Sequence, residues 1–165
     1  MQDRRSSVVA ANENLLVKAN LDLPPNLRAL DNRIEQVELG LRAAIVAALE
    51  DDASQIPENL LPRVSEKIER AIKKSPSLQE VDLAPLLRKL EYFDLRELQD
   101  LITNKTHWEK FSNLFTGKEA LIAKFNQLAE LRNCIRHNRS VDDITRMEGE
   151  AAVNWFESCL QRAIT

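Results

Sequence analysis

The sequence predicts an all-α protein, folded as an up-and-down bundle of about six to seven helices. Two observations carry this prediction. The 165 residues include only 3 Gly and 6 Pro, and Leu, Ala, Glu, Arg and Lys dominate, which favours helix. Apolar residues also recur at spacings of three and four through most of the chain, as on one face of an α-helix. The length suits a single domain over 1–165, which could also be one domain of a longer protein.

Three helices are predicted in the N-terminal half. The stretch 6–20 is amphipathic, and the prolines of "LDLPPN" end it because Pro cannot continue a helix. Residues 26–51 form a long helix, and 58–74 form a third, in which Pro62 is tolerated only in the first turn, so the start is expected to slip later. The long helix is expected to pack against others along a seam of Leu27, Leu30, Ile34, Val37, Leu41, Ala44 and Ala48.

Residues 83–104 form either two short helices or one kinked helix. Asp94 and Glu97 are spaced as a capping box that would open the second of these helices. Thr106 and Glu109 repeat this spacing before "HWEKFSNLF" and predict another helix start. The apolar edge of that helix is expected in the core, and it consists of Trp108, Phe111, Leu114 and Phe115.

Two antiparallel helices, over 117–139 and 140–165, are predicted to close the bundle. Ser140, followed by Asp142 and Asp143, is typical of an N-terminal cap and an acidic first turn. We therefore expect a tight turn at 138–140.

Composition and charge exclude several classes of protein. The net charge of −3 argues against a general electrostatic nucleic-acid binder, so any anion site must be local. The longest apolar run, "AAIVAAL", is too short to span a membrane, which favours a soluble protein of the cytoplasm. Cys134 and Cys159 cannot build a disulfide framework and are expected to be small buried thiols. No metal-ligand spacing and no phosphate-binding glycine loop occurs.

One local cluster departs from the helical pattern. The stretch "LRNCIRHNR", 131–139, holds three arginines, two asparagines and one of the two histidines of the chain. Arg132 continues the three-and-four spacing of the preceding apolar residues, so it is expected in the middle of the apolar stripe, where its charge needs an anion or a carboxylate. Arg136 and Arg139 lie within about 40° of it around the helix, and Asn133 and His137 form an i, i+4 pair on the adjoining edge. From Lys124 to Arg139 the local charge is +3, since four cations face Glu130 alone.

The segment "RNCIRH", 132–137, resembles the arginine–four residues–histidine signature of the HEPN superfamily, with the polar Asn133 directly after the arginine. The resemblance covers about residue 111 to the C-terminus and implies a dimerising helical bundle whose two motifs meet across the interface. It also implies metal-independent RNA cleavage without a cofactor, leaving 2′,3′-cyclic phosphate and 5′-hydroxyl ends. Arg132, His137 and Asn133 would be the catalytic residues.

The same resemblance implies partners for the chain. RNA would be the substrate, and Arg136, Asn138 and Arg139 would help to bind it, although Arg136 stands where small or apolar residues are common in the family. A second copy of the chain is expected, and a toxin of this family would need an antitoxin, often of nucleotidyltransferase type. Toxin–antitoxin, antiviral defence and RNA-processing roles remain open, as do fused domains.

The residue types suit this chemistry. Histidine exchanges protons near neutral pH, and a fixed guanidinium can hold the charge of a pentavalent phosphorane. Each chain supplies one motif histidine, and a two-fold dimer would supply the second. On one straight helix Arg132 and His137 point about 140° apart, which also favours a composite site or a helix that unwinds near His137.

Two alternatives stay open. A HEPN module could bind RNA or nucleotide, or mediate assembly, without cleaving. A helical interaction protein with no catalytic cluster is the other. A nuclease needs Arg132 and His137 accessible in a shared cleft, whereas a buried Arg132 with a carboxylate partner favours the interaction protein.

Overall fold

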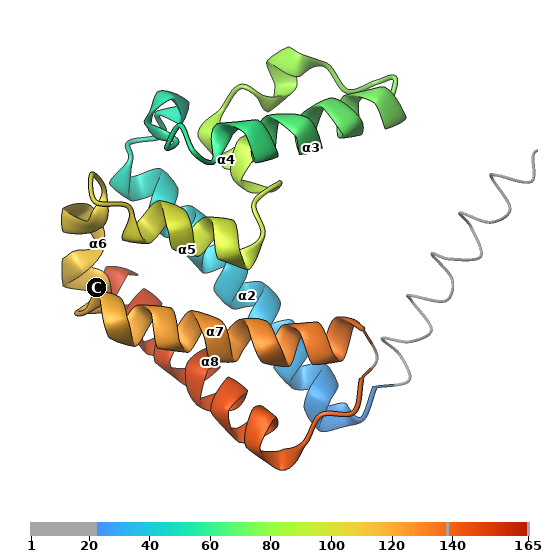
Figure 1. The fold of residues 1–165 in the computed structure, drawn as a ribbon, viewed down its shortest axis with the longest axis vertical. Helices are drawn as coiled ribbons and strands as arrows, with labels where there is room; N and C mark the ends of the chain where they lie inside the picture. Colours follow the sequence, from blue (N-terminus) through green and yellow to red (C-terminus); the bar gives the residue numbers. More distant parts are fainter. Residues whose placement is uncertain (1–22, 138, 165) are drawn as a thin grey trace, which may run out of the picture.

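The computed structural model describes residues 23–137 and 139–164, and over these residues it is all-helical, which confirms the predicted fold class (Figure 1). The helix predicted over 6–20 lies outside the described residues. Seven α-helices and two short 3-10 helices occur in the described part: α2 Pro25–Ala48, η1 Ala53–Gln55, α3 Leu61–Lys74, η2 Glu80–Leu83, α4 Leu86–Leu90, α5 Leu95–Thr103, α6 Trp108–Phe115, α7 Lys118–Arg136 and α8 Asp143–Ile164.

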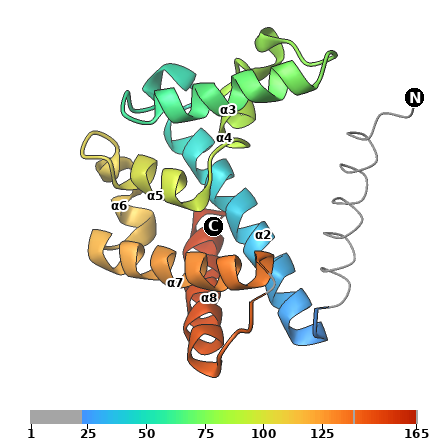
Figure 2. The same cartoon turned by 45° about the vertical axis from the view of Figure 1, so that its right-hand side comes forward.

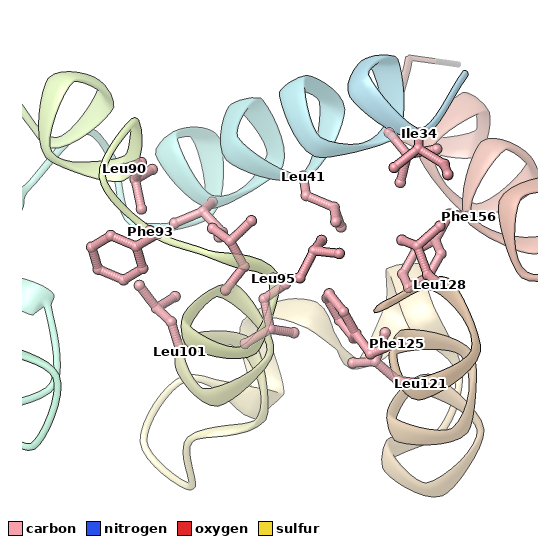
Figure 3. Packing of buried hydrophobic residues seen from close by; sticks show 14 of the residues in the cluster. Ile34, Leu41, Leu90, Phe93, Leu95, Leu101, Leu121, Phe125, Leu128 and Phe156 are labelled. Carbon is pink, nitrogen blue, oxygen red and sulfur yellow. The ribbon is translucent and has the colours of Figure 1, made fainter. Parts of the chain in front are cut away.

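Helix α2 is the spine of the bundle. It contacts α8, α7, α5 and α4, and the most extensive helix pair is α7 with α8. The views in Figures 1 and 2 place α3 at one end of α2 and the end of α7 at the other. Figure 3 shows Ile34 and Leu41 of α2 facing α7 and α8 across the core. The end of α7, which carries the motif, therefore lies against the first half of α2.

The seam of α2 follows the predicted pattern for most of its length. Leu30, Ile34, Val37 and Leu41 are buried, as expected from their spacing. Beyond Leu41 the prediction is wrong, because Ile45 and Leu49 are fully buried and the smaller Ala44 and Ala48 are half-buried. Ile and Leu remove more apolar surface from water than Ala, so the helix turns these larger side chains inward.

The starts of α3 and α5 agree with the local sequence signals. Helix α3 begins at Leu61, so Pro62 falls in its first turn and the expected slip is confirmed, although Leu61 itself is exposed. Asp94 and Glu97 form the predicted capping box of α5, with the Glu97 amide 2.8 Å from Asp94 Oδ1 and the Asp94 amide 3.0 Å from Glu97 Oε1. Helices α4 and α5 are separate, which selects one of the two predicted alternatives.

Two predicted caps are wrong. Helix α6 begins at Trp108, and His107 rather than Thr106 is its N-cap residue, without a side-chain cap. His107 is buried instead, with Nε2 2.7 Å from the Gln55 carbonyl oxygen, so this residue joins the start of α6 to η1. At the start of α8, the Asp142 side chain accepts from the Thr145 amide at 2.7 Å, and Ser140 is exposed. The connection to α8 is therefore longer than the predicted turn at 138–140.

Candidate functional site

The motif occupies the last turns of α7 and the residues that follow it. The helix ends at Arg136, and His137 is its C-cap residue, whose amide donates to the Asn133 carbonyl at 2.9 Å. The Arg139 amide then donates to the Cys134 carbonyl at 2.9 Å and closes the helix end. This termination leaves His137, Asn133 and Arg139 exposed to solvent. Asn138 lies outside the described residues.

The sequence predicts Arg132 in the middle of the apolar stripe of α7, and this prediction is wrong. In the structure Arg132 lies beside the stripe. Leu131 is fully buried and Ile135 nearly so, and these two residues continue the core face of Leu128. The Arg132 side chain keeps 28% of its surface exposed. Its stem can therefore pack at the edge of the core while its head reaches the boundary with solvent.

A buried carboxylate of α2 holds the Arg132 guanidinium. Arg132 Nε lies 2.6 Å from Glu38 Oε1, and the Glu38 side chain is only 9% exposed. The N–H bond does not point at this oxygen, so the contact is a close ion pair and not an aligned hydrogen bond. The second oxygen of Glu38 lies 3.8 Å from Arg42 Nη2. Glu38 thus lies between two guanidinium groups, which balances the unfavourable burial of its charge.

Arg136, one turn after Arg132 on α7, also contacts α2. Its Nε lies 3.8 Å from Oδ1 of the buried Asp31, and its Nη2 donates to Glu35 Oε1 at 3.2 Å. Asp31, Glu35 and Glu38 follow each other by four and three residues, so they share one edge of α2. This acidic edge faces Arg132 and Arg136, so the basic patch predicted from α7 alone is largely balanced across the helix pair.

His137 differs from the arginines in having no such support. In the described part of the chain, no hydrogen bond or ion pair holds its imidazole, and none joins it to Arg132. Pockets of ≈ 260, ≈ 350 and ≈ 400 Å³ that the described residues line lie elsewhere, and neither Arg132 nor His137 lines these three. Among the described residues, the structure therefore joins Arg132 to Arg136 through α2, and no hydrogen bond or ion pair joins Arg132 to His137.

The cysteines are buried and free, as predicted. Burial raises the pKa of the Cys134 thiol, and the nearby Glu130 carboxylate adds to this effect. Burial likewise raises the pKa of the Cys159 thiol. A protonated, enclosed thiol is a poor nucleophile, so neither cysteine is a candidate for covalent catalysis.

Sequence reasoning missed the acidic residues of α2 that complete the site. Asp31 and Glu38 occupy helix positions beside the apolar seam of α2, and this placement was the one available signal. Over the described ranges, no group of three or more metal-ligand side chains occurs, and no helix is long and apolar enough to cross a membrane.

Comparison with known proteins adds no relative. No protein-family model matches the chain, and neither a curated protein nor a solved structure matches it.

Proposed function

We propose that this protein is a metal-independent endoribonuclease of the HEPN type that acts as a homodimer. One observation carries the proposal. At the solvent-exposed end of α7, the exposed imidazole of His137 follows a partly exposed guanidinium, Arg132, that a buried carboxylate holds in place. Arginine and histidine in this order match the signature to which the sequence is similar.

The proposed reaction is a transesterification within the RNA strand. The 2′-oxygen attacks the adjacent phosphorus, the bond from phosphorus to the 5′-oxygen breaks, and a 2′,3′-cyclic phosphate remains. His137 takes the proton from the 2′-hydroxyl or gives one to the departing 5′-oxygen, since imidazole does both near neutral pH. Arg132 stabilises the negative charge that grows on the phosphorane oxygens, and Asn133 is an additional hydrogen-bonding group.

The second imidazole would come from a second copy of the chain. In one chain, His137 and Arg132 share no contact in the described structure. Just after the motif, the first turns of α8 expose two large apolar side chains, Ile144 at 70% and Met147 at 62%. They are spaced i, i+3 and share one face, which supports a self-association surface that would bring two motifs together.

A second candidate function is favoured by the ion pair of Arg132 with Glu38. A guanidinium already neutralised by a buried carboxylate is a weaker electrophilic group than a free one. A carboxylate partner for Arg132 favours the helical interaction protein without a catalytic cluster, and it also supports a HEPN module that binds RNA or nucleotide, or mediates assembly, without cleaving.

RNA cleavage in EDTA tests the proposal. Wild type is expected to cut a varied RNA pool and leave 2′,3′-cyclic phosphate and 5′-hydroxyl ends. His137→Ala is expected to lower the rate by about 100-fold or more, because a general acid–base group is lost. Ser140→Ala, at an exposed neighbouring position, is the matched control and should cleave like wild type. Intact RNA with wild type, together with retained binding, would favour the second candidate.

A further inference from the structure

Glu38 is a buried charged residue that the sequence motif does not include. It lies on α2, and its side chain is 9% exposed. A carboxylate is rarely buried without a specific partner, because removing its charge from water is unfavourable. Here the partners are two arginines, one of which belongs to the motif.

The contact leaves one side of the Arg132 guanidinium available. Glu38 approaches Nε, and within the described residues neither Nη1 nor Nη2 of Arg132 has a hydrogen-bond partner. A guanidinium can bind a phosphate through two parallel N–H bonds along one edge. Holding Nε therefore leaves the edge formed by the two terminal nitrogens for two oxygens of one phosphodiester.

A second arginine, Arg42, contacts the other carboxylate oxygen of Glu38. This oxygen, Oε2, faces Arg42, and Arg42 donates from Nε to the Leu90 carbonyl at 2.9 Å and from Nη2 to the Phe93 carbonyl at 3.2 Å. These carbonyls lie at the end of α4 and just beyond it. A continuous series of contacts therefore runs from α4 through Arg42 and Glu38 to Arg132.

From this arrangement we infer that Glu38 is a positioning residue, which orients Arg132 so that its terminal nitrogens meet the reacting phosphate. The inference rests on the proposed ribonuclease function. Glu35, one turn earlier on α2, lacks this role because its side chain is 51% exposed and contacts Arg136.

A double-mutant cycle on RNA cleavage tests the inference. Glu38→Gln keeps the size of the side chain and removes its charge, and it is expected to lower kcat by about tenfold or more with KM within about twofold. In the Arg132→Ala background the same change is expected to have no further effect, since Glu38 acts through Arg132. Glu35→Gln is the matched control and should stay within about twofold of wild type. A wild-type kcat for Glu38→Gln, or a full multiplicative loss in the Arg132→Ala background, would overturn the inference.

A second variant and a second measurement keep the test independent of folding and of cleavage. Where Glu38→Gln does not fold, Glu38→Asp takes its place in the cycle, because its carboxylate keeps the charge and lies one methylene further from Arg132. In wild type, nuclear magnetic resonance should show the Arg132 Nε–H, which is buried beside Glu38, exchanging with water at least about tenfold more slowly than that of the exposed Arg63, and the Glu38 variant should lose most of this difference.

Equal exchange rates at Arg132 and Arg63 would overturn the positioning role whether or not RNA is cut. Slow exchange at Arg132 without any cleavage would instead reject the nuclease and leave Glu38 as the residue that holds Arg132.

Discussion

At the scale of single residues, the role of a side chain depends on the residues that the fold places next to it. Arg132 belongs to a recognisable motif, yet its closest charged contact is Glu38, which belongs to no motif. The opposite holds for the start of α8. There the sequence predicts Ser140 as the cap, whereas in the structure Asp142 accepts from both the amide and the hydroxyl of Thr145.

This cap gives a prediction at Asp142. The amide of Thr145 first, and then its hydroxyl, hold the pKa of Asp142 below its usual value. A carboxyl group with a lowered folded-state pKa stabilises the fold above its unfolded pKa of about 3.9 and loses that contribution as the pH falls through the folded value. Asp142→Ala should therefore lower the melting temperature at pH 7. The difference in melting temperature between variant and wild type should shrink as the pH falls below about 3.9.

Ser140→Ala is the control for this prediction. It removes the hydroxyl that the sequence suggested as the cap, and no change in melting temperature is expected. A loss at Ser140 equal to that at Asp142 would contradict the capping role assigned to Asp142.

At the scale of elements, the motif helix is placed by its close contact with α8. A Cβ added at Gly149 would lie 2.5 Å from Leu131 Cδ2 and 2.6 Å from Leu131 Cβ, which is closer than carbon atoms pack. Leu131 is fully buried and directly precedes Arg132. The absence of a side chain at Gly149 therefore lets α7 and α8 approach at the position where the motif begins.

Gly149→Ala should consequently destabilise the protein by about 1–3 kcal/mol, because the backbones must move apart to admit the methyl group. Chemical denaturation measures this loss. Gly117→Ser is the control, since a Cβ there meets no atom within 4 Å, and it should leave the stability unchanged or slightly higher. Equal stability of Gly149→Ala and wild type would show that the helix pair tolerates a wider spacing.

At the scale of the whole molecule, α2 connects two ends of the bundle that are built from different helices. One end packs α7 and α8 against the first half of α2 and carries the motif, and the other holds α3 and α4 (Figure 1). Through Glu38 and Arg42, the candidate site is connected to the end of α4. The proposed dimer would join two molecules through the end that carries the motif.

The dimer prediction is tested on α8. Met147→Glu places a charge on the exposed apolar pair that it forms with Ile144, so sedimentation should show a dimer for wild type and a monomer for the variant at micromolar concentration. RNA cleavage should fall when the dimer is lost. The melting temperature should change only by the small amount that is usual for a surface substitution. Val81→Glu, at a residue that is 70% exposed on η2, should remain a dimer. A strictly monomeric wild type would contradict the proposed composite site.

Features that depend on near neighbours along the chain were predictable from the sequence. The all-α class, the start of α3 near Pro62 and the capping box of Asp94 with Glu97 all follow from interactions within one or two helical turns. The RNCIRH stretch could also be found in this way, because its residues share one helix end.

Which side chains face the motif depends on how the helices pack together. Glu38 and Asp31 meet Arg132 and Arg136 because α2 and α7 pack in one register, and the seam of α2 turns Ile45 and Leu49 inward where the alanines were expected. Such pairings depend on how large side chains of several helices fill a common core, and no spacing within one helix specifies them. The motif was therefore readable from the sequence, and the carboxylates that hold its arginines were not.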